Sequence, residues 1–110
     1  MSKNELNYAD IYEEAVIAAK NAEWDFFCKY YGEPMYCGFA FVDFPSARTQ
    51  FVSWCKKNSV GHKHWKKGWT IWNITKNPTQ SMDIKLEGAI AFARVLNSYG
   101  IECDAGCRPD

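Results

Sequence analysis

Apolar residues recur every three or four positions near the start of the chain, which predicts one long helix over residues 8–31. The apolar stripe of this helix is formed by Tyr8, Ile11, Tyr12, Ala15, Ala19, Ala22 and Phe26. Asn7 is a suitable N-cap, and Gly32 followed by Pro34 would end the helix. We expect the outer face to carry the acidic residues Glu13, Glu14 and Glu23.

A dense apolar and aromatic run over residues 36–44 predicts a strand. Because both of its faces are apolar, we expect this strand to lie at the centre of a sheet. Pro45 and Ser46 follow, and they predict a second helix with Ser46 as its N-cap that extends to about Asn58.

The next segment, residues 58–68, is rich in lysine and glycine and is predicted to be a basic loop. A second strand is predicted over residues 69–74. Side chains alternate along a strand, so Trp69 and Ile71 would lie on one face, and the other face would carry Trp72 and Ile74.

A third helix is predicted over residues 83–99. Its buried face would consist of Ile84, Gly88, Ala91, Phe92, Val95, Leu96 and Tyr99. The glycine and alanines of this helix would let it approach a sheet closely. Gly100 at C′ and a contact between Ile101 and Leu96 indicate a Schellman ending. A short strand over residues 101–104 would then precede the C-terminal tail.

These elements predict one α+β domain over residues 1–110, in which the helix 8–31 precedes a β-α-β-α-β unit over residues 36–110. The order is α-β-α-β-α-β, with a small sheet of about three strands packed by helices. No stretch approaches the roughly 18 apolar residues of a membrane span, and the N-terminal residues lack the apolar segment of a secretory signal. We therefore expect a cytoplasmic protein with no membrane contact and with its five cysteines as free thiols.

Charge is strongly segregated along this chain of zero formal net charge. Residues 1–43 hold eight acidic and three basic residues, and residues 83–110 hold five acidic and three basic residues. Residues 44–82 hold seven basic residues and no acidic residue, together with four of the five tryptophans. Local charge decides whether a surface attracts anions, so this segment is the strongest functional signal in the sequence.

Lysines and an indole in the loop around Trp65 suit the binding of nucleic acid or of another phosphate-bearing ligand, because lysines neutralise phosphates and an exposed indole stacks on bases. Trp65 is the tryptophan that we expect to be most exposed. The candidate anion-binding residues are Arg48, Lys56, Lys57, His62, Lys63, His64, Trp65, Lys66 and Lys67. The alternative is that the tryptophans belong to the core and the lysines only solvate the loop.

The segment GFAFVDF, residues 38–44, resembles the RNP1 signature of the RNA-recognition motif family. The resemblance implies a strand whose exposed aromatic residues stack on bases. Phe39 and Phe41 would share one face with Cys37 and Asp43. Cys37 stands where the family has a basic residue, and the strand and helix that precede the signature in that family are missing. We therefore interpret the segment as an apolar core strand.

The sequence gives little support for a zinc site or for a catalytic site. His62 and His64 together with Cys103 and Cys107 could supply four zinc ligands, but their spacing matches no common zinc motif, so we predict no metal and no cofactor. No catalytic motif is present, and only a cysteine–histidine pair built on Cys55 or Cys103 would remain. We predict a non-enzymatic protein.

Four segments resemble a group of small tailed-bacteriophage proteins that has no established activity. They are CGFAFV (37–42), GWTIW (68–72), TQSMDIKLEGAIAFARVL (79–96) and GIECDAGCRPD (100–110). Chains of that group typically end in G-S-R-x-D, whereas Cys107 replaces the serine here. The resemblance leaves out the first helix, and it implies a phage origin and a place in the host cytoplasm.

A protein partner is the second function that the composition allows. An acidic helix or an aromatic patch could bind, or inhibit, a host protein, since aromatic residues anchor many interfaces. The sequence carries no signal for an oligomeric state. For the tail, two alternatives are open: it is disordered, or Arg108 and Asp110 fold back onto the basic loop.

Overall fold

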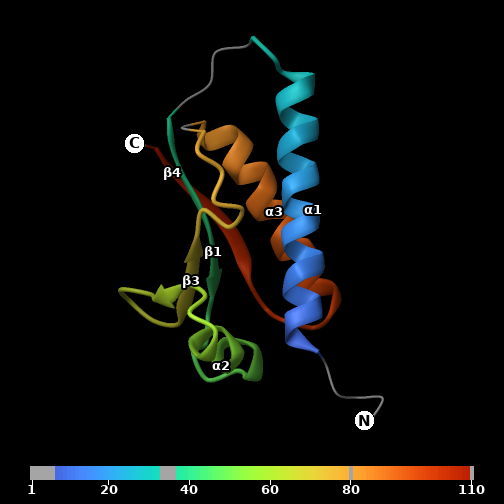
Figure 1. The fold of residues 1–110 in the computed structure, drawn as a ribbon. Coiled ribbons are helices and arrows are strands. Elements are labelled where there is room, and N and C mark those ends of the chain that lie inside the picture. Colours follow the sequence, from blue (N-terminus) through green and yellow to red (C-terminus); the bar gives the residue numbers. More distant parts are fainter. Residues whose placement is uncertain (1–6, 33–36, 80, 110) are drawn as a thin grey trace.

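The computed structural model describes residues 7–32, 37–79 and 81–109. Its elements are α1 (Tyr8–Lys29), β1 (Gly38–Phe44), α2 (Gln50–Lys57), β2 (His62–Lys63), β3 (Trp69–Trp72), α3 (Met82–Ser98) and β4 (Asp104–Pro109) (Figure 1). The predicted α+β class is confirmed, with a fourth strand beyond the three expected. None of the described helices has the length and apolar character needed to cross a membrane.

The four strands form one antiparallel sheet in the order β2-β3-β1-β4. The strand β1 therefore lies at the centre, as its apolar character predicts. Phe41 of β1 is opposite Trp72 of β3 on one side and Gly106 of β4 on the other. The order β1-α2-β2-β3-α3-β4 is the β-α-β-β-α-β order of ferredoxin-like domains, here preceded by the additional helix α1.

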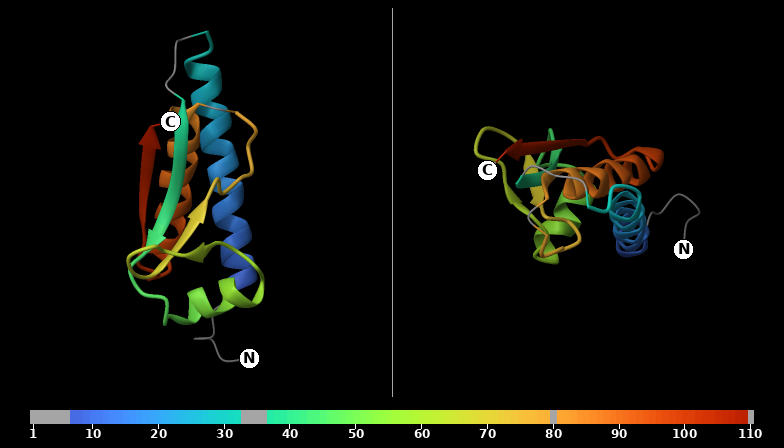
Figure 2. Two further views of the ribbon diagram at one scale, coloured as in Figure 1. Left: turned by 90° about the vertical axis from the view of Figure 1, so that its left-hand side faces the viewer. Right: turned by 90° about the horizontal axis from the view of Figure 1, so that it is seen from above.

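The long helices α1 and α3 lie side by side and cover one face of the sheet, while the other face carries no helix (Figure 2). Alternation along β1 follows this arrangement, because every second residue is buried under the helices. The buried core residues are Ile11, Ala15, Ala19, Ala40, Val42, Phe44, Phe51, Val52, Cys55, Ile71, Ile74, Ala89, Phe92, Ala93, Leu96 and Cys103.

Helix ends follow local chemistry that is visible in the sequence. The side chain of Asn7 accepts a hydrogen bond from the backbone N–H of Asp10, which confirms the predicted N-cap of α1. At the end of α3, Gly100 adopts a φ of +81°, and the backbone N–H of Ile101 donates to the carbonyl of Leu96 at 3.0 Å. These features confirm the Schellman ending.

The predicted start of α2 is wrong. Thr49, not Ser46, is its N-cap, and the Thr49 hydroxyl accepts a hydrogen bond from the backbone N–H of Val52 at 3.2 Å. The Ser46 hydroxyl instead accepts from the backbone N–H of Arg48 at 3.1 Å, which is a local turn. The helix is therefore shorter than expected, although Phe51 is buried as its apolar stripe predicts.

Two segments expected to lack regular structure form strands. The predicted loop 58–68 contains β2, in which His62 pairs with Thr70 of β3. The predicted strand 101–104 is not formed; residues 104–109 of the C-terminal tail form β4 along β1. The tail is thus an edge strand in which Arg108 lies opposite Phe39. Asp110 lies outside the described residues.

The predicted faces of the second strand need one correction. Asn73 adopts a φ of +46°, which ends β3 at Trp72 and turns the chain. Trp72 is therefore 38% exposed on the helix-free face, whereas Ile74 belongs to the core. A strand that continued through Ile74 would have placed both side chains on the same face.

Glu23 is buried, contrary to the prediction that it lies on the outer face of the first helix. Its carboxylate accepts hydrogen bonds from the Thr75 hydroxyl at 2.7 Å and from the Asn77 amide at 3.0 Å. A Cβ at Gly88 of α3 would lie 2.3 Å from Glu23 Oε2. Gly88 therefore makes room for this carboxylate of α1, and not for the sheet as its small size had suggested.

Candidate functional site

Three aromatic side chains form a continuous surface on the helix-free face of the sheet. Phe39 and Phe41 come from β1 and Trp72 comes from β3; we call them the aromatic platform. The Trp72 ring lies 5.6 Å from the Phe39 ring and 5.2 Å from the Phe41 ring, centroid to centroid. Phe39 is 42% exposed. Interpreting residues 38–44 as a core strand is therefore correct for one face of β1 and wrong for the face that carries the platform.

Neighbouring residues hold the platform in place. A Cβ at Gly106 of β4 would lie 2.7 Å from the ring of Phe41, so the absence of a side chain lets this ring lie over β4. The Lys85 ammonium group donates to the carbonyl of Gly38 at 3.2 Å and lies 5.4 Å from the Phe39 ring centroid. One cation of α3 therefore reaches the edge of the platform.

A hairpin formed by β2 and β3 stands beside the platform. Its loop is closed by a hydrogen bond from the backbone N–H of His64 to the carbonyl of Gly68 at 3.0 Å. Gly68 has a φ of +91°, and a Cβ there would lie 2.0 Å from the carbonyl oxygen of Phe44. This glycine therefore lets the base of the hairpin pass directly against the end of β1.

His64 organises the tip of this hairpin. Its Nδ1 accepts hydrogen bonds from the backbone N–H groups of Lys66 at 3.0 Å and Lys67 at 3.4 Å. The neutral ring therefore carries its proton on Nε2. Trp65 is 82% exposed, as the sequence predicts, and its ring stacks against His64 at 5.8 Å with the Lys66 ammonium 4.8 Å from its centroid.

The hairpin and the platform enclose a cavity of about 400 Å³ that we call the open-face cavity. Its walls are Phe41, Asp43, His62, Lys63, His64, Trp65, Thr70, Trp72 and Arg108. Aromatic walls with a few polar groups are typical of ligand-binding cavities. The rim contributes two cations, Lys63 and Arg108, from opposite edges of the sheet.

The polar groups inside this cavity are poorly satisfied. Asp43 Oδ1 and Thr70 Oγ1 are shielded from solvent and have no hydrogen-bond partner. The other carboxylate oxygen, Asp43 Oδ2, lies 3.8 Å from His64 Nε2, which is too far for a hydrogen bond. Buried polar atoms are normally paired, so Asp43 Oδ1 and Thr70 Oγ1 are exceptions among the described residues.

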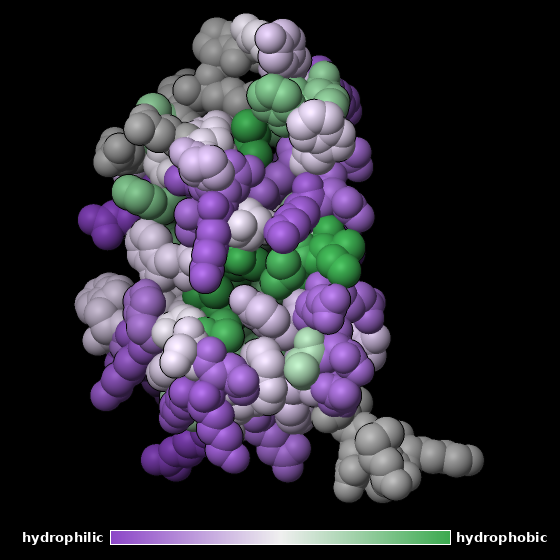
Figure 3. Space-filling model, in the orientation of Figure 1, coloured by the Kyte–Doolittle hydropathy of each residue, from purple (hydrophilic) through white to green (hydrophobic). Residues whose placement is uncertain are grey.

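No acidic side chain of the described residues lies within 4.0 Å of the charged group of a hairpin lysine. Among the described residues, the contact between His64 and Asp43 is the only one within 4.0 Å between a basic and an acidic side chain. Figure 3 shows hydrophilic residues gathered over the hairpin and α2. Lys63, Lys66 and Lys67 are thus free to meet an anionic ligand.

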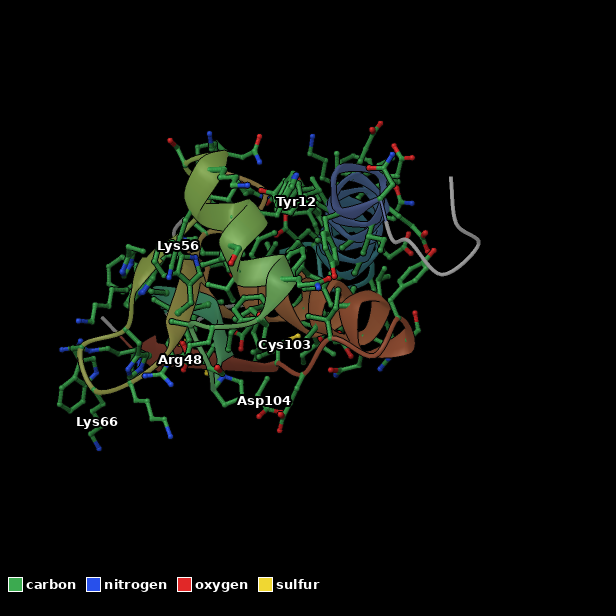
Figure 4. The ribbon with its side chains drawn as sticks, turned by 90° about the horizontal axis from the view of Figure 1, so that it is seen from below. Tyr12, Arg48, Lys56, Lys66, Cys103 and Asp104 are labelled. Carbon is green, nitrogen blue, oxygen red and sulfur yellow. The ribbon has the colours of Figure 1, made fainter. Side chains whose placement is uncertain are left out.

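The remaining predicted anion-binding residues lie apart from the open-face cavity. Arg48 and Lys67 line a different hollow of about 590 Å³ at the base of the hairpin. Lys56 donates to the carbonyl of Ala47 at 3.0 Å, and Lys57 is exposed at the end of α2. Figure 4 shows Lys66 projecting from the hairpin, well separated from Lys56 on α2. The structure therefore divides the predicted patch into a hairpin part and an α2 part.

Cys55 and Cys103, the two cysteines considered for catalysis, are buried, whereas Cys107, considered as a zinc ligand together with Cys103, is exposed. Burial raises the pKa of the Cys55 thiol and that of the Cys103 thiol to about 12. The Cys103 sulfur lies in the core, 3.8 Å from the carbonyl of Ala93. Over the described residues, no three or more His, Cys, Asp or Glu side chains come together in a way that could hold a metal ion.

Five of the residues that build this site were not among the predicted anion-binding residues: Phe41, Asp43, Thr70, Trp72 and Arg108. Phe41 and Asp43 were visible on one face of the RNP1-like segment, but the sequence did not show which face the helices cover. Arg108 was considered only as part of a tail. Its position in β4, along β1, explains how it reaches the cavity.

Comparisons with known families, curated proteins and solved structures found no match. No protein-family model matches the chain. No curated protein and no solved structure matches it significantly. The resemblance to bacteriophage proteins stays a prediction.

Proposed function

We propose that this protein binds single-stranded nucleic acid across the helix-free face of its sheet. The observation that carries the proposal is the aromatic platform, in which Phe39 and Trp72 are exposed and Phe41 is partly exposed on two adjacent central strands beside a basic hairpin. The arrangement is similar to that of RNA-recognition motif domains, in which aromatic residues on a four-stranded sheet stack on two or three bases. Here the first and third strands carry the rings.

Stacking and charge would contribute separately to the affinity. Each base stacked on an aromatic ring is worth about 1–3 kcal/mol and requires no particular base identity. Trp72 and Phe41 would supply stacking on the sheet, and Trp65 would supply it at the hairpin tip. Lys63, Lys66 and Arg108 would neutralise phosphates around the cavity, which steers a polyanion toward the site.

Fluorescence anisotropy with labelled single- and double-stranded oligonucleotides, of DNA and of RNA, tests this proposal. Single strands should bind more tightly than duplexes, since a stacked duplex does not offer its base faces to the platform. Trp72→Ala should weaken single-strand binding by about 1–3 kcal/mol. Trp24→Ala is the matched control, because Trp24 is 64% exposed on α1, away from the platform. Absence of binding at low salt would refute the proposal.

Salt dependence separates the charge contribution from stacking. The logarithm of the affinity for a single strand should fall linearly with the logarithm of salt concentration, by about 0.7 for each phosphate neutralised. The double variant Lys66→Ala/Lys67→Ala should have a shallower slope, and the difference should correspond to the loss of roughly one or two neutralised phosphates. Lys57→Ala, on α2, should leave the slope unchanged.

A second candidate function, binding of a protein such as a host factor, is supported by a different surface. Three exposed aromatic residues lie near the end of α1: Trp24, Phe27 and Tyr31. The Phe27 ring contacts the rings of both Trp24 and Tyr31. Trp24 and Phe27 also line a cavity of about 430 Å³. Exposed aromatic clusters of this kind anchor protein interfaces. A protein complex that is lost in Trp24→Ala and kept in Trp72→Ala would favour this function over the first.

A further inference from the structure

We infer that the open-face cavity recognises a base by its edge and prefers guanine, an inference that rests on the proposed single-strand binding. The aromatic platform alone would accept any base, because every base has a flat π face. The polar floor of the cavity differs from the platform, since hydrogen-bonding groups can distinguish one base from another. The preference therefore depends on Asp43 and His64.

Asp43 is the central group of this floor. An ionised carboxylate only accepts hydrogen bonds and offers about four acceptor sites. None of these sites is used within the described chain: Oδ1 has no partner, and Oδ2 is 3.8 Å from His64 Nε2. A carboxylate beside aromatic walls gains most from a ligand that brings N–H donors and no negative charge. A phosphate next to this carboxylate would be repelled, so the base and not the phosphate would lie against Asp43.

Thr70 and His64 complete the floor of the cavity. Thr70 is 2% exposed and lies directly opposite Asp43 in the register of β1 and β3. Its hydroxyl oxygen is shielded from solvent, so Thr70 shapes the floor beside Asp43 and does not itself contact a base. His64 keeps Nδ1 occupied by the backbone of Lys66, which leaves the Nε2–H as a donor on the side of Asp43. The floor thus combines a strong acceptor with an adjacent donor.

Guanine matches this combination better than the other bases. Its Watson–Crick edge carries two adjacent donors, N1–H and the N2 amino group, next to the acceptor O6. Both donors can approach Asp43 Oδ2, the carboxylate oxygen that is not shielded from solvent, while O6 can accept from the imidazole N–H. Adenine and cytosine offer an amino donor beside an unprotonated ring nitrogen, which a carboxylate repels. Uracil and thymine place one N–H between two carbonyl oxygens, which is the least favourable pattern.

The rim of the cavity carries the cations that this orientation calls for. Lys63 and Arg108 line the same cavity from β2 and β4 and would contact the phosphates that flank the bound base. Phe41 and Trp72 would contact the face of the base while Asp43 reads its edge. This division between backbone contacts and base contacts is the usual source of specificity in nucleic-acid recognition.

The test uses labelled oligothymidine and oligouridine strands in which one central base is replaced by guanine, adenine or cytosine. Anisotropy titrations with the full-length protein should show about tenfold tighter binding of the guanine strand, as one bidentate contact commonly gives. Replacement of that guanine by inosine, which lacks the N2 amino group, should remove much of the preference. The inosine comparison needs no protein variant, so it does not depend on the folding of a mutant.

Two variants locate the preference. Asp43→Asn should abolish the guanine preference, so that the guanine, adenine and cytosine strands bind the variant with similar affinity. Asp104→Asn is the matched control, because Asp104 is an exposed acid of β4 opposite Asp43 that does not line the cavity. Circular dichroism of each variant verifies the fold.

The outcomes separate the two proposals. If all strands bind equally, or if Asp43→Asn keeps the preference, the base-reading role of the cavity is overturned and single-strand binding stands. If no strand binds the wild-type protein, single-strand binding itself is overturned, and this inference falls with it. A guanine preference in DNA but not in RNA, or the reverse, would support the inference and identify the nucleic acid.

Discussion

The ring of Phe41 lies over Gly106, a residue of the neighbouring strand β4 that has no side chain to obstruct it. A methyl group at this position would lie 2.7 Å from the ring, which is closer than two carbon atoms approach without repulsion. The platform therefore depends on a glycine 65 residues further along the chain, at the opposite end of the sequence from α1.

Gly106→Ala should displace the Phe41 ring and disturb its contact with Trp72. We expect a loss of about 1 kcal/mol in the free energy of unfolding, at the lower end of overpacking effects because the ring can rotate. The near-ultraviolet circular dichroism of the aromatic residues should change as well. Cys107→Ala, an exposed neighbour on the same strand, is the control and should leave both measurements near wild type.

Gly68→Ala should destabilise the protein by more than Gly32→Ala. Both glycines have positive φ values, +91° and +84°, so each substitution incurs a conformational cost of about 1 kcal/mol. Only the Gly68 substitution also places a Cβ against the carbonyl oxygen of Phe44; Gly32 has open space around it. Urea denaturation of the two variants measures the difference, and equal effects would contradict this explanation.

Glu23→Ala should lower the free energy of unfolding by about 1–3 kcal/mol. The substitution removes the acceptor for the Thr75 hydroxyl and the Asn77 amide, and it leaves a gap beside Gly88. Glu23→Gln, which keeps an acceptor oxygen, should cost less. The exposed Glu13→Ala on the same helix should change stability by less than about 0.5 kcal/mol, and thermal unfolding compares all three.

Cys55 and Cys103 should resist alkylation in the folded protein. Their pKa values near 12 arise because burial disfavours the charged thiolate, so at pH 8 only about one thiol in ten thousand is ionised. Cys28 and Cys107 are exposed and should react first with iodoacetamide. Mass spectrometry of peptides after short labelling measures the order, and labelling in denaturant should remove it.

Much of the helical structure could be predicted from the sequence because it depends on neighbouring residues. Asn7 begins α1 and Gly100 ends α3 through contacts within a few positions of the chain. The burial of Glu23 had a local signal as well: it continues the four-residue spacing of Ile11, Ala15 and Ala19. Glu23 was nevertheless predicted to lie on the outer face of the helix, because acidic residues are usually exposed.

The strands that complete the site could not be predicted in the same way. β2 has two residues, and it exists because His62 and Lys63 pair with β3. β4 contains glycine and proline, which argue against a strand, and its pairing with β1 joins segments that are far apart in sequence. The platform became visible only with the structure, since the sequence of β1 is apolar on both faces.

The shortness of β2 has a consequence for how the protein moves. β1 is hydrogen-bonded on both sides, so its amides should be among the last to exchange with deuterated solvent. β2 is an edge strand held by two register pairs, and it should open at a small fraction of the global unfolding free energy. The wall of the open-face cavity formed by β2 would then be mobile, while the wall formed by β1 stays rigid. Ligand binding would therefore be accompanied by ordering of β2.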